Sequence, residues 1–392
     1  MPDGIDEDFY QHLVGSVDKD MLTPVVRACL GLEIASVTTW QYAQIFGGAG
    51  NGLLGTAVFC FQGNALAQDR TLSWSLILKI LAARPEESPS VPSYWKREAD
   101  AYKSGVFDDL PGGLLAPRCF GIIEYPDTAC MLWLEHIAEP GKPRWSLEDY
   151  GIAAQYLGRF NGAYLVNRKL PAMPWLCTTP PYDAATSKPH IRSFLENPDH
   201  PAVRRIFPGG IIHQIDHVWS RHDVYRHALD HLPQTFCHFD AFRRNLFLSA
   251  DSQNYERVVA IDWAIAGIGA VGEDVAALAY LSLLFIEVDA VQASELDNLV
   301  FDRYVTGLAD AGWKGDRRSV RLGYTSHFIL RWLEDIALAA LFLDESNYTG
   351  IEQSLGHSRT VFDGMDQFSK ISQYGLDLAH EAQALMKTLG SL

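Results

Sequence analysis

The spacing of apolar and polar residues changes about one third of the way along the chain. Before that point, short apolar runs separated by glycine-rich or polar turns are typical of β-strands. They predict strands over residues 56–62, 73–81, 118–125 and 129–137. Residues 94–105 have a helical pattern that ends at Gly105, and the proline- and serine-rich segment 85–93 predicts a loop.

Beyond a predicted linker at residues 139–145, the pattern is mainly helical. The segment that begins at Ser146 has the order of a capping box, and apolar residues follow it at helical spacing. Around residues 234–263, three short β-like runs interrupt the helices. We therefore predict an α+β protein with a small β-rich lobe over residues 1–137 and a larger, mainly helical lobe over residues 138–392.

The composition fits a large globular protein. With 392 residues, 48% of them apolar, the chain is long enough for two lobes and a large core. The longest uncharged apolar run, residues 275–286, is too short to span a bilayer, so no membrane partner is expected. The acidic N-terminus lacks the apolar region of a signal peptide, and the six cysteines form no CxxC pair. We therefore expect a cytoplasmic protein with reduced thiols.

The formal net charge of −16 bears on the partner. Proteins that bind the nucleic-acid backbone normally present a basic face, so a nucleic-acid partner is not expected. The acidic balance is compatible with a cationic small substrate. Acidic charge that only maintains solubility is the more ordinary interpretation.

Polar residues cluster in the β-like interruption. His238, Asp240 and Asn245 precede an apolar run, and Asp262 ends the next run, seventeen residues beyond Asn245. Mg²⁺ prefers oxygen ligands, which Asp262 and Asn245 would supply from neighbouring strand ends. Asp240 would orient an acceptor hydroxyl and take its proton. The motif thus predicts phosphoryl transfer, although taken alone it also fits a polar turn.

Lys79 follows the apolar run 73–78, inside or at the end of a predicted strand. A lysine in a strand is unusual unless it lies at an edge or has a partner. We interpret it as a charge on nucleotide phosphates, held by Glu98 in the helical stretch nineteen residues on. The alternatives are an edge-strand lysine that prevents aggregation and an exposed glutamate paired with Lys103 or Arg97.

Gly50, Gly52 and Gly55 match the pattern GxGxxG. The residues that follow are β-like, so a dinucleotide fingerprint, which needs a following helix, is not indicated. A glycine-rich turn between strands can instead donate backbone N–H groups to a triphosphate. A flexible hairpin is an equally good interpretation of the glycines alone. The order glycine turn, strand lysine, helix glutamate, HxDxxxxN and strand-end aspartate favours a nucleotide-dependent kinase.

Residues 237–247 and 258–279 resemble the catalytic hairpin and following helix of aminoglycoside phosphotransferases, choline kinases and their relatives. Those proteins have the bilobal protein-kinase-like fold. The pair Asp262-Trp263 and the later Asp274-Val275-Ala276 agree with the family pattern. The resemblance extends from about residue 20 to the C-terminus and is most specific over residues 237–279.

The resemblance implies a role for each matching residue. It makes Asp240 the catalytic base, and Asn245 and Asp262 the Mg²⁺ ligands. It also implies that Lys79 contacts the phosphates and that Glu98 orients Lys79.

Further roles follow from the same resemblance. His238 would pack and hydrogen-bond within the catalytic loop without acting as the base, and Asp274 would support that loop. Asp274 could also simply cap the helix that begins there. The strand end at Glu135 to Ile137 is similar to the hinge segment, where the backbone groups of these two residues would bind adenine.

The sequence also departs from the family pattern. Phe239 stands where the family often has glycine. Phe242 replaces a lysine found two residues after the catalytic aspartate in many protein kinases. Arg243 or Arg244 could supply positive charge to the transferring phosphate, or both could be surface charges beside the loop.

We therefore expect a kinase that uses ATP and Mg²⁺ to phosphorylate a hydroxyl of an aminoglycoside-like molecule, an amino alcohol or another small metabolite; GTP remains open as the donor. The sequence lacks D-F-G and A-P-E motifs, and Asp262 runs quickly into the next helix, which argues against a protein kinase. The alternative is a nucleotide-binding pseudokinase with a regulatory or scaffold role. Carboxylates such as Asp216, Glu334 and Asp335 would favour an amine acceptor, whereas aromatics such as Trp313 and Trp332 would favour an apolar alcohol.

Overall fold

The computed structural model describes residues 7–45, 56–84, 88–137, 144–178, 182–251, 254–355 and 359–390. Gly50, Gly52 and Gly55 lie outside the described residues, as does most of the predicted linker.

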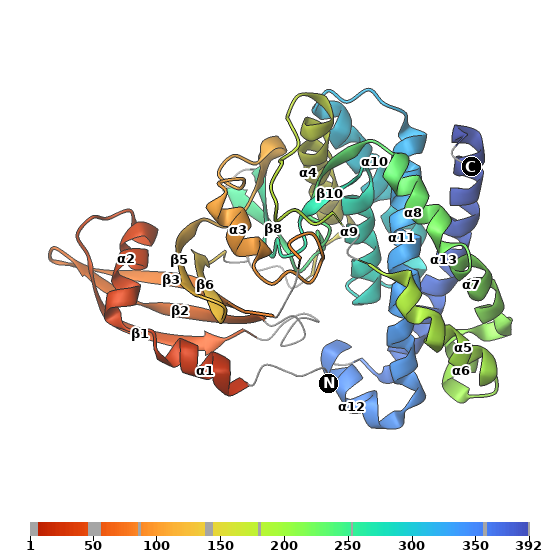
Figure 1. Ribbon diagram of the computed structural model, residues 1–392, viewed down its shortest axis with the longest axis horizontal. Coiled ribbons are helices and arrows are strands. Elements are labelled where there is room, and N and C mark those ends of the chain that lie inside the picture. The colour runs from red at the N-terminus through yellow and green to blue at the C-terminus, as the bar shows by residue number, and fades with distance from the viewer. Residues whose placement is uncertain are drawn as a thin grey trace.

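The N-terminal part is built on an antiparallel sheet with the spatial order β1-β2-β3-β6-β5 (Figure 1). Its strands are β1 (Ser36–Gln44), β2 (Thr56–Ala67), β3 (Arg70–Ala82), β5 (Cys119–Tyr125) and β6 (Ala129–Glu135). The four predicted strands are confirmed, and β2 and β3 extend beyond their predicted bounds. Strand β1 was not predicted because most of its residues are exposed, so no run of apolar residues indicates it.

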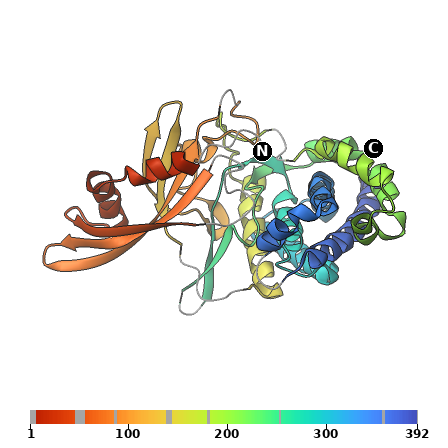
Figure 2. The same ribbon diagram turned by 90° about the horizontal axis from the view of Figure 1, so that it is seen from below.

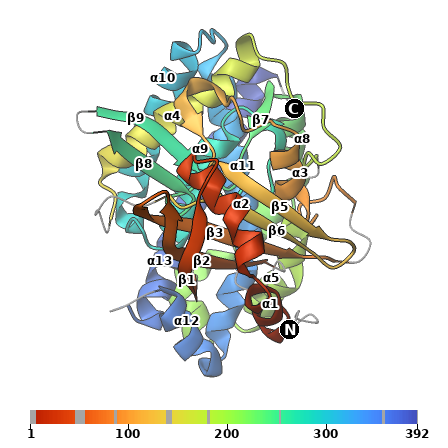
Figure 3. The same ribbon diagram turned by 90° about the vertical axis from the view of Figure 1, so that its left-hand side faces the viewer.

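Helices cover this sheet. Helices α1 (Glu7–Gly15) and α2 (Lys19–Leu30) come first in the chain, and Figure 3 shows α2 lying across the sheet. Leu22 and Val26 of α2 belong to the same buried cluster as Phe59, Phe61 and Trp133 of the strands. The sheet therefore has a hydrophobic core of its own.

The rest of the chain is mainly helical and lies at the other end of the molecule (Figures 1 and 2). Its helices are α4 (Leu147–Val166), α5 (Lys188–Glu196), α6 (Pro201–Ile206), α7 (Ile212–Trp219), α8 (His222–His231), α9 (Glu273–Leu284), α10 (Ala293–Asp310), α11 (Arg317–Ala339), α12 (Tyr348–Leu355) and α13 (Val361–Leu389). The predicted capping box is present. The Ser146 hydroxyl accepts the Asp149 N–H at 3.3 Å, and the Asp149 carboxylate accepts the Ser146 N–H at 2.8 Å.

Short strands interrupt these helices as predicted. Strands β8 (Leu246–Asp251) and β9 (Asn254–Ala260) form an antiparallel hairpin, with β4 (Leu114–Leu115) pairing in parallel beside β9. Strand β7 (Gln234–Cys237) pairs with β10 (Gly267–Ala270), which was not predicted because its alternating glycines give no β-like pattern.

Helix α3 (Arg97–Lys103) lies where these two parts meet. Ala99 packs in a small cluster with Leu81 and Leu132 of the sheet, whereas Ala101 belongs to the large core of the helical part. The α+β class, with a β-rich N-terminal sheet and a helical C-terminal region, is thus confirmed. The boundary between residues 137 and 138 stays a prediction, because α3 contributes to both cores.

No helix in the described ranges combines the length and apolar character needed to cross a bilayer.

Candidate active site

Lys79 is buried and lies between two carboxylates. Its Nζ is 2.5 Å from Oε2 of Glu98 and 2.7 Å from Oδ1 of Asp262. Strand β3 supplies the lysine and α3 supplies the glutamate, while the aspartate follows β9. The structure therefore brings together three predicted site residues from separate parts of the chain, and the alternatives of an edge-strand lysine and an exposed glutamate are wrong.

The charges of this group stabilise one another. Burial opposes the ammonium form of Lys79, but the carboxylates of Asp262 and Glu98 outweigh that effect and raise its pKa. Partial burial likewise opposes ionisation of Asp262, yet the adjacent ammonium holds the pKa of this carboxyl below its ordinary value. Glu98, whose side chain is only 1% exposed, keeps a raised pKa because burial dominates. Lys79 is therefore protonated and positively charged at neutral pH.

The loop after β7 holds the second group of predicted residues. Nδ2 of Asn245 donates to the Asp240 carboxylate at 2.8 Å and to the Asp240 carbonyl oxygen at 2.9 Å. His238 is buried, and its Nδ1 accepts the Asp240 N–H at 3.2 Å. Its Nε2 lies 2.9 Å from the carbonyl oxygen of Ile261 and must be the protonated nitrogen, because a carbonyl only accepts. His238 therefore joins the loop to the residue before Asp262.

The two ends of the β8–β9 hairpin lie side by side. The N–H of Ile261 donates to the carbonyl oxygen of Asn245 at 2.9 Å, so Asn245 and Asp262 stand next to each other at the open end of the hairpin. The sequence pattern predicted this proximity from neighbouring strand ends.

The pKa values separate Asp240 from His238. Burial raises the pKa of Asp240 to about 6, and the negative charge of Asp262 adds to the rise, while Arg331 and Asn245 oppose it. Burial lowers the pKa of His238 to about 4. At neutral pH, Asp240 is an ionised acceptor of protons, whereas His238 is neutral and fully hydrogen-bonded.

Asp274 supports the loop by accepting hydrogen bonds from its backbone. Its Oδ1 accepts the N–H of Phe239 at 2.7 Å, and its Oδ2 accepts the N–H of His238 at 3.2 Å and Nδ2 of Asn161 at 3.0 Å. Burial raises its pKa to about 6, while the hydrogen bonds favour the ionised form. The arrangement agrees with the supporting role that the family resemblance implies, and the helix-cap alternative does not account for these contacts.

Two residues of the site have a left-handed backbone. Phe239 has φ of 66° and Asp262 has φ of 62°. This conformation is unfavourable for most residues that carry a side chain, which explains why glycine suits the position of Phe239. The backbone turns the chain immediately before Asp240 and at Asp262, so that both carboxylates lie at the same end of the hairpin.

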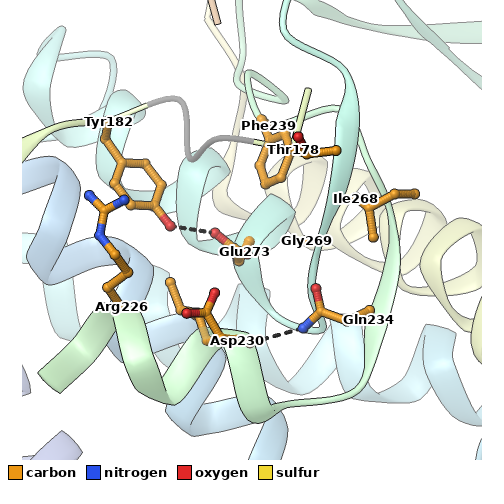
Figure 4. A pocket seen from close by; sticks show the side chains of 10 residues that line it. Thr178, Tyr182, Arg226, Asp230, Gln234, Phe239, Ile268, Gly269 and Glu273 are labelled. Atoms are coloured by element: carbon orange, nitrogen blue, oxygen red, sulfur yellow. Dashed lines mark hydrogen bonds between the residues drawn. The ribbon is translucent and has the colours of Figure 1, made fainter. Parts of the chain in front are cut away.

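A small polar pocket lies beside the loop (Figure 4). Its lining includes Phe239, Tyr182, Glu273 and Arg226, and its volume is about 90 Å³. The Tyr182 hydroxyl donates to Glu273 at 2.7 Å. Ligand pockets usually have volumes of about 300–1,000 Å³, so this pocket is too small for a nucleotide.

The remaining predicted residues are less closely tied to this centre. Glu135 ends β6, and its N–H donates to the carbonyl oxygen of Arg118 at 2.8 Å. That N–H is therefore committed within the sheet, and only the carbonyl of Glu135 is left to the predicted adenine contact. Ile137 lies two residues beyond the strand.

The two arginines of the loop have partners of their own. Arg243 is buried, and its guanidinium lies 4.9 Å from the centroid of the Trp145 ring. Nε of Arg244 lies 3.0 Å from the Glu287 carboxylate. Both side chains therefore brace the segment that carries Asn245, and the interpretation of Arg243 as a surface charge is wrong.

Three charged residues of α11 belong to no sequence motif. The positive charge of Arg331 on α11 acts on Asp240, and Glu334 and Asp335 follow Arg331 by three and four residues. These spacings place the three side chains on one face of the helix. Asp335 accepts the Tyr280 hydroxyl at 2.9 Å. The sequence offers Glu334 and Asp335 as candidate carboxylates, but no sequence pattern indicates that Arg331 lies near Asp240.

The donor set fits a divalent cation held jointly with phosphates. Asn245 and Asp262 offer an amide oxygen and a carboxylate, as Mg²⁺ prefers. No described group of three or more His, Cys, Asp or Glu side chains could hold a metal ion by itself. Any metal at this site would therefore depend on oxygen ligands from a nucleotide and water.

Comparison with known proteins identifies the class. The family model described as the phosphotransferase enzyme family matches residues 77–304, more than half of the chain. The chain therefore belongs to this family of phosphotransferases. No curated protein matches the sequence.

Solved structures similar to this chain include three kinases. An amicoumacin kinase in complex with AMP-PNP, Ca²⁺ and Ami has 13% identity and a TM-score of 0.49, covering 94% of this chain and 96% of its own. Spectinomycin phosphotransferase in complex with ADP and spectinomycin has 12% identity and a TM-score of 0.46, covering 94% and 99%. The choline kinase of Cryptosporidium parvum has 12% identity and a TM-score of 0.45, covering 90% and 91%.

Proposed function

We propose that this chain transfers the γ-phosphoryl group of ATP to a hydroxyl of a small acceptor that carries an amine. The observation that carries this proposal is the position of Lys79 between Glu98 and Asp262, at distances of 2.5 and 2.7 Å. A buried ammonium held by two carboxylates is a fixed point charge suited to phosphate oxygens.

The nucleotide would bind along the junction between the sheet and the helical part. Lys79 would contact its phosphates, and Glu98 would hold the lysine in place. The glycine turn with Gly50, Gly52 and Gly55 would cover the phosphates. The carbonyl of Glu135 and the N–H of Ile137 would bind adenine, because they lie at and just beyond the end of β6, the strand that pairs with β3.

Asn245 and Asp262 would hold Mg²⁺ together with the phosphates. The cation would supply charge neutralisation for the triphosphate. Nδ2 of Asn245 is already committed to Asp240, which leaves the amide oxygen to face the metal. This division lets one amide orient the base and hold the cation.

Asp240 would act as the catalytic base. The acceptor oxygen forms a bond to the γ-phosphorus as the bond from that phosphorus to the ADP oxygen breaks, and the hydroxyl proton moves to the Asp240 carboxylate. His238 would hold the loop through its two ring nitrogens and transfer no proton. A loose transition state makes this positioning the main contribution of the protein.

The acceptor would be recognised partly by charge. Glu334 and Asp335 lie on the face of α11 that also carries Arg331, which acts on Asp240. Burial raises the pKa of Glu334 to about 7, and a bound ammonium group would favour its ionised form. This supports an amino alcohol or aminoglycoside-like acceptor over an apolar alcohol.

The test is a phosphorylation screen with ATP and, separately, GTP over amino alcohols, aminoglycosides and uncharged alcohols. We expect ATP-dependent phosphorylation of an amine-bearing acceptor, and a loss of about 10²–10⁴-fold in Asp240→Asn with nucleotide binding retained. Asp310→Asn, which alters an exposed carboxylate that pairs with Arg159, is the matched control. Nucleotide binding without phosphorylation of any acceptor would overturn the proposal and favour the pseudokinase.

A further inference from the structure

Arg97, the residue before Glu98, is completely buried at 0% exposure. The guanidinium donates to five backbone carbonyl oxygens in the part of the chain that the structure describes. Nε donates to Trp175 at 2.8 Å, Nη1 to Ala264 at 2.7 Å and to Pro92 at 3.0 Å, and Nη2 to Pro89 at 2.9 Å and to Val91. The side chain thus uses the five N–H donors of a guanidinium.

These carbonyl groups come from three separate segments. Pro89, Val91 and Pro92 belong to the loop before α3, Trp175 belongs to the helical part, and Ala264 follows Asp262 by two residues. One side chain on α3 therefore fixes the helix to the loop that precedes it and to two segments far along the chain.

Arg97 and Glu98 grip the same stretch of backbone. Arg97 donates to the carbonyl of Ala264 at 2.7 Å, and the Glu98 carboxylate accepts the N–H of Trp263 at 3.4 Å. Asp262, the other partner of Lys79, immediately precedes this stretch. The contact of Arg97 with Ala264 therefore joins α3, which carries Glu98, to the segment that begins at Asp262.

A buried guanidinium needs partners for every donor, because an unpaired buried charge is strongly unfavourable. Arginine meets this need through its planar fork of donors, whereas lysine has three donors on one nitrogen and cannot reach carbonyls on diverging segments. The alternative that pairs Glu98 with Arg97 is wrong, because Glu98 pairs with Lys79 and the Arg97 guanidinium donates to backbone carbonyl oxygens.

We propose that Arg97 is a positioning residue for nucleotide binding. It fixes α3 against residues 262–264, so that Glu98 and Asp262 hold Lys79 from two sides in the geometry that phosphate binding needs. This inference rests on the proposed function of the Lys79 site.

The test is a double-mutant cycle on binding of Mg²⁺·AMP-PNP, measured by isothermal titration calorimetry with wild type, Arg97→Lys, Glu98→Gln and the double variant. We expect Arg97→Lys to raise Kd about tenfold or more. In the Glu98→Gln background the same change should raise Kd by less than about twofold, because the carboxylate that Arg97 positions is already lost. Arg159→Lys, which alters an exposed arginine paired with Asp310, should leave Kd unchanged.

The readout separates positioning from mere structural support. A purely structural role would lower the fraction of protein that binds, and thus the measured stoichiometry, with Kd unchanged. That result, or an equal rise in Kd in both backgrounds, would overturn the inference. If wild type itself fails to bind Mg²⁺·AMP-PNP or Mg²⁺·GMP-PNP, the proposed function fails instead.

A second variant guards against loss of folding. Arg97→Gln removes the buried charge and keeps two N–H donors, so it avoids an unpaired ammonium. We expect it to fold and to raise Kd as Arg97→Lys does, again only in the Glu98 background. A folded Arg97→Gln protein with the wild-type Kd would also overturn the inference.

Discussion

Oδ1 of Asp274 accepts the N–H of Phe239 at 2.7 Å and thereby holds the residue that precedes Asp240. Each of the three groups that Asp274 contacts is a donor, which requires two acceptor oxygens. In Asp274→Asn, the amide NH₂ replaces one of these oxygens and faces other donors. We expect a loss of about 2–4 kcal/mol in the free energy of unfolding and a fall in kcat of about tenfold or more, measured by urea denaturation and by turnover.

The control for this change is Asp310→Asn at the surface, which should lower stability by less than about 1 kcal/mol. A stable Asp274→Asn protein with the kcat of wild type would show that the loop holds its shape without this carboxylate.

The activity should depend on the ionisation of Asp240. Because burial raises its pKa to about 6, the base is ionised at neutral pH and becomes protonated as the pH falls through that value. We expect kcat/KM to decrease about tenfold per pH unit below about pH 6 and to be level from about pH 7 to 8. A pH–rate profile with the best acceptor of the screen measures this.

His238 should add no inflection to that profile. Its pKa of about 4 keeps it neutral across the tested range, and both ring nitrogens are engaged in the loop. In His238→Gln, kcat should fall while the inflection near pH 6 remains. Loss of the inflection in this variant would assign the titrating group to His238.

The buried carboxylate of Asp240 should make the folded protein less stable at neutral pH than at acidic pH. The folded-state pKa of Asp240 is about 6 against an ordinary value of 3.8, so the folded form binds the proton more tightly than the unfolded form. Its contribution to stability is present at low pH and is lost as the pH rises through about 6. Asp240→Asn removes the charge and should therefore exceed wild type in stability by about 1–3 kcal/mol at pH 7.5.

Urea denaturation at pH 5 and pH 7.5 tests this sign. The stability difference between Asp240→Asn and wild type should shrink at pH 5, where the wild-type carboxyl is largely protonated. A difference that grows at pH 5 would contradict the raised pKa.

Lys79 should matter for stability as well as for nucleotide binding. In Lys79→Met, two carboxylates face each other without the ammonium between them. We expect a loss of about 3–5 kcal/mol in the free energy of unfolding together with loss of Mg²⁺·AMP-PNP binding. Denaturation and calorimetry on the same samples measure the two effects.

The double variant Lys79→Met/Glu98→Gln separates the loss of stability from the loss of nucleotide binding. Removal of the Glu98 charge should recover part of the lost stability but none of the nucleotide binding. If binding returned in the double variant, Lys79 would not be the phosphate contact.

The sequence predicted the parts of the site that depend on local pattern. Asn245 and Asp262 were placed together because they flank one hairpin, and hairpin pairing brings such ends side by side. Lys79 and Glu98 were paired because a strand lysine requires a partner. Each of these predictions needed only the chemistry of one residue and the element that carries it.

Other parts depend on contacts that no local pattern encodes. Arg97 and Glu98 stand side by side in a short polar helix, and both resemble exposed residues. Their burial is decided by Trp175 and by the segment after Asp262, far away in the chain. Arg331 illustrates the same limit, because its closeness to Asp240 follows from how α11 packs in the helical core.

The grip of Arg97 on main-chain oxygens leaves the side chains at the contacted positions open to change. Every residue carries a carbonyl group, so replacing Ala264, Pro89 or Val91 does not remove the acceptor that Arg97 uses. A scan of single substitutions at Pro89, Val91 and Ala264 should therefore weaken nucleotide binding less than substitution of Arg97 does.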